Sequence, residues 1–168
     1  MKQITFLRHA KSDWANNDLK DIDRALNERG YLDAYEGSAI FLNENLIPDR
    51  LYTSTATRAL STALIFARTL NFRMQQFQLE PRLYETSVHF LLSFIQSQND
   101  TDQHVMLVGH NPATTEACNA FLKSGSIDEV PTCGLFTLIF NCKNWKNVKF
   151  ESAELKYFQY PKMNKKNN

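Results

Sequence analysis

The stretch "TFLRHAKSDW", residues 5–14, holds the transition from a predicted buried strand to a polar segment. Its first part carries apolar side chains, Phe6 and Leu7, that belong in a core. The strand then ends in Arg8 and His9, two side chains that are costly to bury without a partner. An arginine fork binds two phosphate oxygens at once, so we expect Arg8 and His9 to meet a phosphate group.

Further along the chain, predicted strands alternate with predicted helices. The strand at 104–109, "HVMLVG", is continuously apolar, as is typical of a central parallel strand covered on both faces. The other predicted strands are 2–7, 50–54, 74–80, 134–141 and 148–155, the last two joined as a hairpin through 142–147. This alternation predicts an α/β fold, a three-layer sandwich with a mostly parallel central sheet.

Four helices are predicted between these strands. Asn27 and Ser87 are suitable N-caps, and Asn111 with Pro112 forms an N-cap and first-turn pair. Another helix begins near Thr57. The first helix shows apolar side chains at helical spacing, namely Leu32, Tyr35, Ala39, Leu42 and Leu46.

Polar side chains follow three of the predicted strands. After Arg8 and His9, they are Arg58 within residues 54–60 and His110 directly after Gly109. Because ligands in such sheets bind beyond the carboxyl ends of the strands, these groups are expected to converge. Two arginines can hold phosphate oxygens, a neutral imidazole can attack phosphorus, and a second imidazole can donate to a phosphoryl oxygen.

Each signal alone has an ordinary explanation. Arg8 and His9 can be a surface pair, Arg58 a solvated side chain, and His110 a donor to a loop carbonyl. Three such coincidences in strand-end register are much less frequent than one. The histidines lack metal-ligand spacing, and no Cys-x-x-Cys or glycine-rich phosphate loop occurs, so we expect no metal and no cofactor.

The composition is that of one ordinary globular domain. The 168 residues include 43% hydrophobic and 22% charged side chains, with a net charge of +1. This balance gives no electrostatic reason to expect nucleic-acid or membrane partners. Three widely spaced cysteines and the lack of a signal-peptide pattern favour a reduced, cytoplasmic location. We expect one domain over 1–160 and a disordered polar tail over 161–168.

Four motifs resemble those of one protein family, from about residue 3 to about residue 140. "LRHAKS" at 7–12, "TSTATRAL" at 53–60 and "LVGHNP" at 107–112 resemble motifs of the histidine phosphatase, or phosphoglycerate mutase-like, superfamily. "DRALNERG" at 23–30 and the short chain resemble its phosphohistidine phosphatase (SixA-like) subgroup. The resemblance implies a metal-independent phosphatase with the phosphoglycerate mutase-like fold.

The resemblance also implies roles for individual residues. His9 would be the nucleophile that becomes phosphorylated, while Arg8, Arg58 and His110 would clamp the phosphoryl oxygens. Glu85, in "RLYETS", matches the position of the family's general acid, although it can equally be a solvated carboxylate near a helix start. Members of the phosphohistidine subgroup can lack this acid.

The chain departs from the family pattern near its first motif. Ala10 replaces a usual glycine, and Ala15 stands where an asparagine often contacts phosphate, a role open to Asn16 or Asn17. Ser12 is expected to bind near the substrate. Lys11 and Arg24 are nearby cations that can equally be surface charges. Without the long insertions of larger relatives, the site is expected to be open.

Three functions remain in consideration. The favoured function is a phosphatase acting on phosphohistidine of a phosphorylated protein partner. The second is hydrolysis of a small phosphomonoester, and the third is a phosphate-binding module without turnover. A phosphate binder has no need of a nucleophile, which argues against the third. The sequence gives no oligomeric state.

Overall fold

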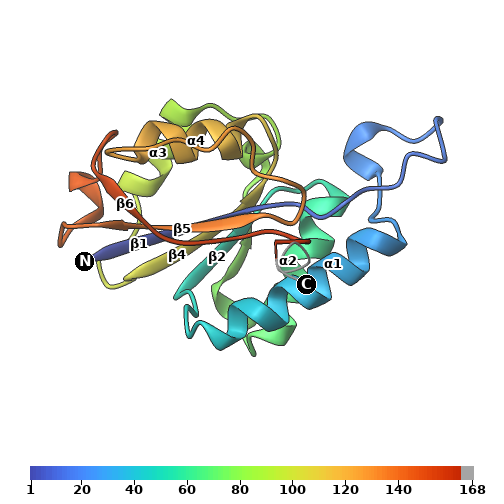
Figure 1. Cartoon of the computed structure of the whole chain (residues 1–168), viewed down its shortest axis with the longest axis horizontal. Helices are drawn as coiled ribbons and strands as arrows, with labels where there is room; N and C mark the ends of the chain where they lie inside the picture. Colours follow the sequence, from blue (N-terminus) through green and yellow to red (C-terminus); the bar gives the residue numbers. More distant parts are fainter. Residues whose placement is uncertain (164–168) are drawn as a thin grey trace.

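The computed structural model describes residues 1–163, which form a three-layer α/β sandwich around a six-stranded sheet (Figure 1). The strands are β1 (Lys2–Arg8), β2 (Arg50–Thr53), β3 (Phe77–Leu79), β4 (His104–Gly109), β5 (Leu135–Phe140) and β6 (Ala153–Gln159). The helices are α1 (Glu28–Asn43), α2 (Thr57–Thr69), α3 (Val88–Gln96) and α4 (Ala113–Phe121). Short 3-10 turns are η1 (Asp21–Asp23), η2 (Met74–Gln76), η3 (Pro81–Leu83) and η4 (Trp145–Asn147).

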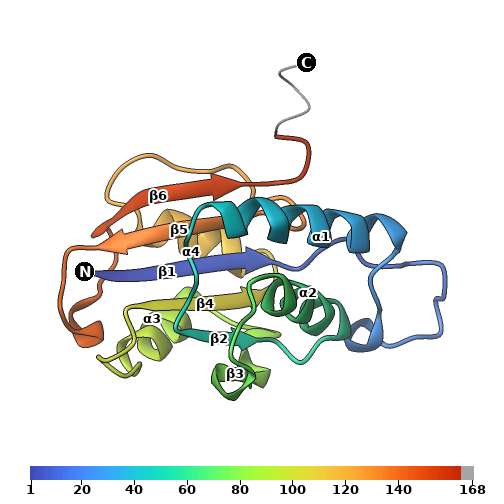
Figure 2. The ribbon, with the colours of Figure 1, turned by 90° about the horizontal axis from the view of Figure 1, so that it is seen from below.

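The sheet order is β3-β2-β4-β1-β5-β6, and its first four strands run parallel (Figure 2). β5 pairs antiparallel with β1, and β6 pairs antiparallel with β5. The prediction of a mostly parallel α/β sheet is therefore confirmed. The centre of the sheet is β4 beside β1, which brings the carboxyl ends of these two strands together.

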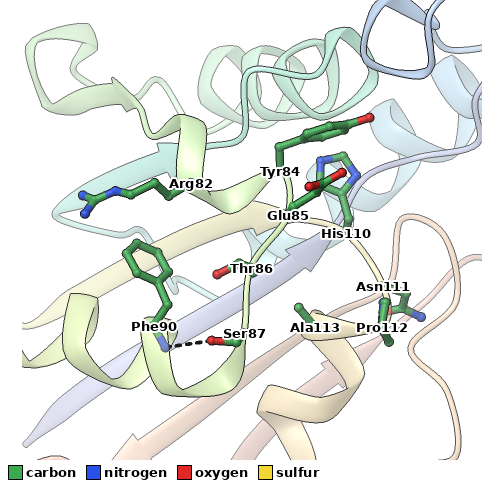
Figure 3. Close-up of a pocket in the computed structure, with 10 residues that line it drawn as sticks. All are labelled: Arg82, Tyr84, Glu85, Thr86, Ser87, Phe90, His110, Asn111, Pro112 and Ala113. Atoms are coloured by element: carbon green, nitrogen blue, oxygen red, sulfur yellow. Dashed lines mark hydrogen bonds between the residues drawn. The ribbon is translucent and has the colours of Figure 1, made fainter.

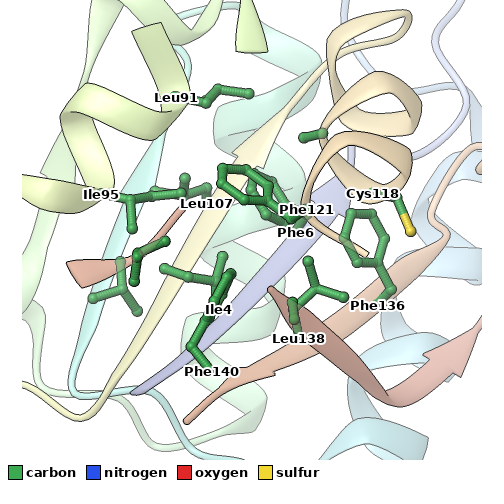
Figure 4. Packing of buried hydrophobic residues seen from close by; sticks show 14 of the residues in the cluster. Ile4, Phe6, Leu91, Ile95, Leu107, Cys118, Phe121, Phe136, Leu138 and Phe140 are labelled. Atoms are coloured by element: carbon green, nitrogen blue, oxygen red, sulfur yellow. The ribbon is translucent and has the colours of Figure 1, made fainter. Parts of the chain in front are cut away.

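Both faces of the sheet are covered, which explains its continuously apolar central strands. α3 and α4 lie over one face, and α1 and α2 over the other (Figure 1). Phe6 points to the first face, where its ring stacks on Phe136 and Phe121 at centroid distances of 5.1 and 6.2 Å (Figure 4). Its neighbour Leu7 points to the opposite face and joins the second core.

Two of the predicted helix starts are confirmed by their caps. Asn27 Oδ1 accepts a hydrogen bond from Gly30 N, and Ser87 Oγ accepts one from Phe90 N. The prediction for α4 was wrong in detail, because this helix has no side-chain N-cap. Asn111 Oδ1 instead accepts from the Thr115 side chain.

Two further expectations differ from the structure. The first helix forms, but its large apolar side chains Leu32 and Tyr35 are exposed. Small residues, including Ala34 and Gly37, form its buried face and let α2 pack closely. The strand predicted at 148–155 was wrong, since β6 begins only at Ala153. The backbone N–H groups of 151 and 152 donate to carbonyls at the end of α4 instead of to the sheet.

The C-terminal residues, the hydropathy of the helices and the cysteines each add one observation. Residues 161–163 form a turn, and the rest of the expected tail at 161–168 lies outside the described residues. None of the helices found within 1–163 is long and apolar enough to cross a membrane. The three cysteines form no disulfide with one another.

The connection between β1 and α1 extends away from the body of the fold (Figure 1, Figure 2). Its base is held where Asn27 N donates to Lys11 O and Asp13 N donates to Ala25 O. Gly30, in the first turn of α1, allows this approach, because a Cβ there would lie 2.1 Å from Lys11 O. A glycine is therefore needed at position 30 to seat the residues that directly follow His9.

Replacing Gly30 by alanine is expected to lower the free energy of unfolding by about 1–3 kcal/mol, because the added methyl group collides with rigid backbone. Gly37→Ala in the same helix is the matched control, since its Cβ would make only ordinary contacts, the nearest at 3.5 Å. The control is expected to be neutral or slightly stabilising. Urea denaturation measures both, and equal stability of the two variants would contradict this packing argument.

Candidate active site

The parallel pairing of β1 with β4 brings the two histidine motifs together. In this register Arg8 is opposite Gly109, so His9 and His110 leave the sheet at the same edge. Their ring centroids are 4.9 Å apart. β2 lies on the other side of β4, and α2 starts just beyond its end with Arg58 in its first turn. Arg8, His9, Arg58 and His110 are thus neighbours, as expected.

His9 is buried, with 9% of its surface exposed, and its tautomer is fixed. Its Nδ1 lies 2.7 Å from Ala10 O, and because a carbonyl only accepts, Nδ1 must carry a proton. Nε2 therefore keeps its lone pair and accepts a hydrogen bond from Arg58 Nε at 3.3 Å. These contacts leave Nε2 able to act as a nucleophile.

The charge state of His9 also suits a nucleophile. Burial lowers the pKa of His9 to about 4, more than the hydrogen bond to Ala10 raises it. The charges of Arg58 and Arg8 contribute to this lowering, although burial is the larger cause. The imidazole is neutral at physiological pH.

Arg58 has a partner at every nitrogen of its guanidinium. Nε donates to His9, Nη1 donates to Asp21 O at 2.6 Å, and Nη2 donates to Asp21 Oδ2 at 2.8 Å. The arginine is only 7% exposed. The guanidinium is held with its Nε edge toward the nucleophilic nitrogen of His9.

His110 is a second neutral imidazole. Its Nε2 is 2.8 Å from Ser54 Oγ, and that oxygen already accepts from Ala56 N. When the Ser54 hydroxyl donates its proton to Nε2, the ring proton of His110 is on Nδ1. Burial, the largest cause, and the neighbouring His9 and Arg58 together lower the pKa of His110 to about 3.

Arg8 is fixed by contacts with the segment between α4 and β5. Its Nη1 donates to Glu129 Oε1 and to Val130 O, both at 2.7 Å. Asn111, next to His110, also donates to Val130 O, at 3.1 Å. The segment between α4 and β5 thus supports both strand-end motifs.

Two buried nitrogens at this site, Arg8 Nε and His110 Nδ1, have no hydrogen-bond partner within residues 1–163. A buried donor without a partner costs about 1–3 kcal/mol, so the site favours a ligand that accepts from both. A tetrahedral oxyanion bound at His9 Nε2 would accept from these two groups and from Arg58 Nε. The arrangement is suited to phosphoryl transfer.

A cavity of about 610 Å³ opens beside His110 (Figure 3). Glu85 is exposed and lines this cavity together with Tyr84, Phe90 and Pro112. The site was expected to be open, and this cavity is. The side chains of His9 and His110 are nevertheless buried.

The remaining candidates near the first motif lie outside this group. Ser12 is buried at the base of the β1–α1 connection, where it bridges to Leu26. Ala15, Asn16 and Asn17 are exposed. Within residues 1–163 no group of His, Cys, Asp and Glu side chains is arranged to hold a metal ion.

Comparison with models of protein families identifies the family of this chain. Residues 4–91, more than half of the sequence, match the model of the histidine phosphatase superfamily, branch 1.

The chain belongs to the histidine phosphatase superfamily.

Solved structures of histidine phosphatases share its fold. A crystal structure from Agrobacterium tumefaciens, of a candidate phosphohistidine phosphatase SixA, is 29% identical with a TM-score of 0.77. The alignment covers 95% of this chain and 98% of that one. The protein histidine phosphatase SixA complexed with tungstate gives a TM-score of 0.80 at 15% identity, with 95% and 97% covered, and supports the fold alone.

Curated relatives match either most of the chain at lower identity or a short part of it at higher identity. An uncharacterized chloroplastic protein of Arabidopsis thaliana is 27% identical over 165 residues, covering 88% of this chain and 70% of the plant protein. A 2,3-bisphosphoglycerate-dependent phosphoglycerate mutase of an Arthrobacter strain is 37% identical over 65 residues. That match covers 38% of this chain and only 26% of the mutase.

Sequence reasoning missed the residues that support this histidine phosphatase site. Ser54 contacts His110, Thr62 Oγ1 accepts from Ala10 N, and Asp21 and Glu129 hold the two arginines. Ser54 directly follows β2, so its position after a strand was an available signal. Asp21 and Glu129 come from irregular segments, which give no periodic signal.

The buried histidines make the stability of this histidine phosphatase depend on pH. Burial lowers the pKa of His9 and His104 to about 4 and that of His110 to about 3, against 6.5 in an unfolded chain. Full stability is therefore expected above about pH 6.5. Below it the unfolded chain takes up protons that the folded chain does not, and stability falls until about pH 4.

The expected decrease is roughly 1 kcal/mol per histidine for each pH unit in this window. Urea denaturation at about pH 7, 6 and 5 measures it. The His9→Asn variant lacks one of the three groups and should lose stability less steeply as the pH falls. Equal stability of the unmodified protein at both ends of this range would contradict the buried, neutral state of these side chains.

Proposed function

We propose that this protein is a metal-independent phosphatase that hydrolyses phosphohistidine on a partner protein through a phosphorylated His9. The observation that carries the proposal is the neutral His9, which directly follows Arg8 and whose ring lies 4.9 Å from that of His110. Within residues 1–163, Arg8 Nε and His110 Nδ1 are buried without a hydrogen-bond partner. The 29% identity with the candidate phosphohistidine phosphatase SixA of Agrobacterium tumefaciens supports the phosphohistidine substrate.

In the first step His9 Nε2 attacks phosphorus in line with the departing group. A bond forms between phosphorus and His9 as the bond between phosphorus and the substrate imidazole breaks, and the leaving ring keeps the electron pair. Arg8, Arg58 and His110 donate to the equatorial oxygens as charge shifts onto them. The hydrogen bond from His9 Nδ1 to Ala10 O stabilises the positive charge of the phosphorylated ring.

In the second step a water oxygen attacks the same phosphorus. The bond to His9 Nε2 breaks, the imidazole recovers its lone pair, and the proton of the water passes to solvent or to the product phosphate. No step requires a metal ion, because the two arginines supply the positive charge. The protein contributes positioning and charge stabilisation.

The leaving group decides how much a general acid matters. An imidazole leaves phosphorus readily, whereas an alkoxide needs a proton as it departs. Glu85 lines the cavity next to His110, where a leaving group would be placed. This position is the observation that favours a second candidate function, hydrolysis of small phosphomonoesters.

Ser12 is proposed only as support for the segment after His9.

Quench-trapping with labelled phosphohistidine is expected to give an acid-labile, alkali-stable protein phosphate. The His9→Ala variant should give none, because it lacks the attacking nitrogen. Ser54→Ala, which keeps all four basic side chains, should still become labelled but more slowly, since His110 loses its partner. Label that attaches equally well to His9→Ala would exclude the covalent mechanism.

The Glu85→Gln variant distinguishes the two candidate substrates. Hydrolysis of an alkyl phosphate is expected to fall by roughly 10²-fold, because the alkoxide loses its proton donor. Hydrolysis of phosphohistidine should change less than about twofold by the same reasoning. Steady-state rates on both substrates measure this, with Glu80→Gln as a control outside the cavity lining. Equal losses on both substrates would show that Glu85 does not act as the acid.

A further inference from the structure

The contacts around Asp21 lead to an inference that rests on the proposed function and deepens it. We propose that Asp21 is a positioning residue, which holds the Arg58 guanidinium in the orientation needed to bind the phosphoryl group at His9. Asp21 contacts Arg58 twice, through its backbone carbonyl at 2.6 Å and through its carboxylate at 2.8 Å.

Arg58 needs such a partner because its location is unfavourable for a cation. It lies in the first turn of α2, where the helix dipole disfavours positive charge. Only 7% of its surface is exposed. A buried charge without a counter-charge is costly. Asp21 is the carboxylate that forms an ion pair with Arg58, at 2.8 Å.

The two contacts from Asp21 also select which edge of the guanidinium faces the nucleophile. Nη1 and Nη2 are directed to Asp21, so Nε is the nitrogen directed to His9. Without the Asp21 carboxylate, Nη2 loses its partner and Nη1 keeps only the backbone carbonyl of residue 21, so the guanidinium can rotate. The binding geometry for a phosphoryl oxygen would then no longer be fixed.

Asp21 is itself fixed from a second direction. Tyr84 Oη donates to Asp21 Oδ2 at 2.6 Å, and the Tyr84 ring packs edge-on against His110 at 5.4 Å. The hydrogen bond from Tyr84 and the one from Arg58 lower the pKa of Asp21, which keeps the carboxylate charged. The Asp21 carboxylate therefore joins the β1–α1 connection to both Arg58 and Tyr84, although its side chain is half exposed.

The opposite role for Asp21 is competition. A carboxylate on Arg58 can instead repel an incoming phosphoryl group and occupy nitrogens that would bind it. The two roles predict opposite signs for the effect of removing the carboxylate, so one measurement separates them.

The test is a double-mutant cycle of Asp21→Ala and Arg58→Ala, read by hydrolysis of p-nitrophenyl phosphate and by binding of inorganic phosphate. Neither probe requires a phosphohistidine substrate. If Asp21 acts through Arg58, its removal should lower kcat/KM by about 10- to 100-fold and weaken phosphate binding in the unmodified protein. In the Arg58→Ala background the same change should have less than about a threefold effect.

Three controls make the result specific. Asp21→Asn keeps an oxygen acceptor for Arg58 and should recover part of the lost activity. Asp23→Ala, in the same 3-10 turn, removes an exposed carboxylate for which no side-chain contact is found within residues 1–163 and should leave activity unchanged. Thermal unfolding of every variant shows whether the fold is retained.

Additive losses in the two backgrounds would overturn the proposal, as would tighter phosphate binding by Asp21→Ala, which would indicate competition. Hydrolysis of p-nitrophenyl phosphate without hydrolysis of phosphohistidine would refute the proposed substrate, while the cycle would still decide the role of Asp21. A protein that binds no phosphate at all would overturn both proposals.

Discussion

The parallel pairing of β1 with β4 is the constraint on which the rest of the site depends. Because Arg8 is opposite Gly109, the residues that follow the two strands emerge side by side, and their imidazoles lie 4.9 Å apart. A shift of one residue in this register would turn the side chains of β1 to the wrong faces of the sheet. The register is fixed by the two cores, since Phe6 and Leu7 must each reach the layer that covers them.

The positive charges and hydrogen-bond donors of the site are suited to binding an anion from solution. Burial keeps His9 and His110 neutral, so the two arginines carry the positive charge and the imidazoles remain able to react or donate. Each arginine has a carboxylate partner, Asp21 or Glu129, which lowers the cost of holding the cations in place. Within residues 1–163, Arg8 Nε and His110 Nδ1 are buried without a hydrogen-bond partner and can donate to such an anion.

The sequence predicted those parts of the site that are tied to regular structure. Arg8, His9 and His110 directly follow apolar strands, and a strand pattern specifies where its own end lies. Asp21 and Glu129 reach the arginines from irregular segments, and local sequence does not encode where such segments return. The sequence also did not predict which face of α1 is buried. A hydrophobicity pattern places Leu32 and Tyr35 in the core, whereas Ala34 and Gly37 are buried and Leu32 and Tyr35 are exposed.

A crystal structure of the protein with bound tungstate tests the central claim most directly, because that tetrahedral anion imitates a phosphoryl group at its acceptor. The account predicts tungsten next to His9 Nε2, with its oxygens accepting from Arg8 Nε, Arg58 Nε and His110 Nδ1. An anion bound at His9 Nδ1, or one that contacts only one of the two histidines, would contradict it.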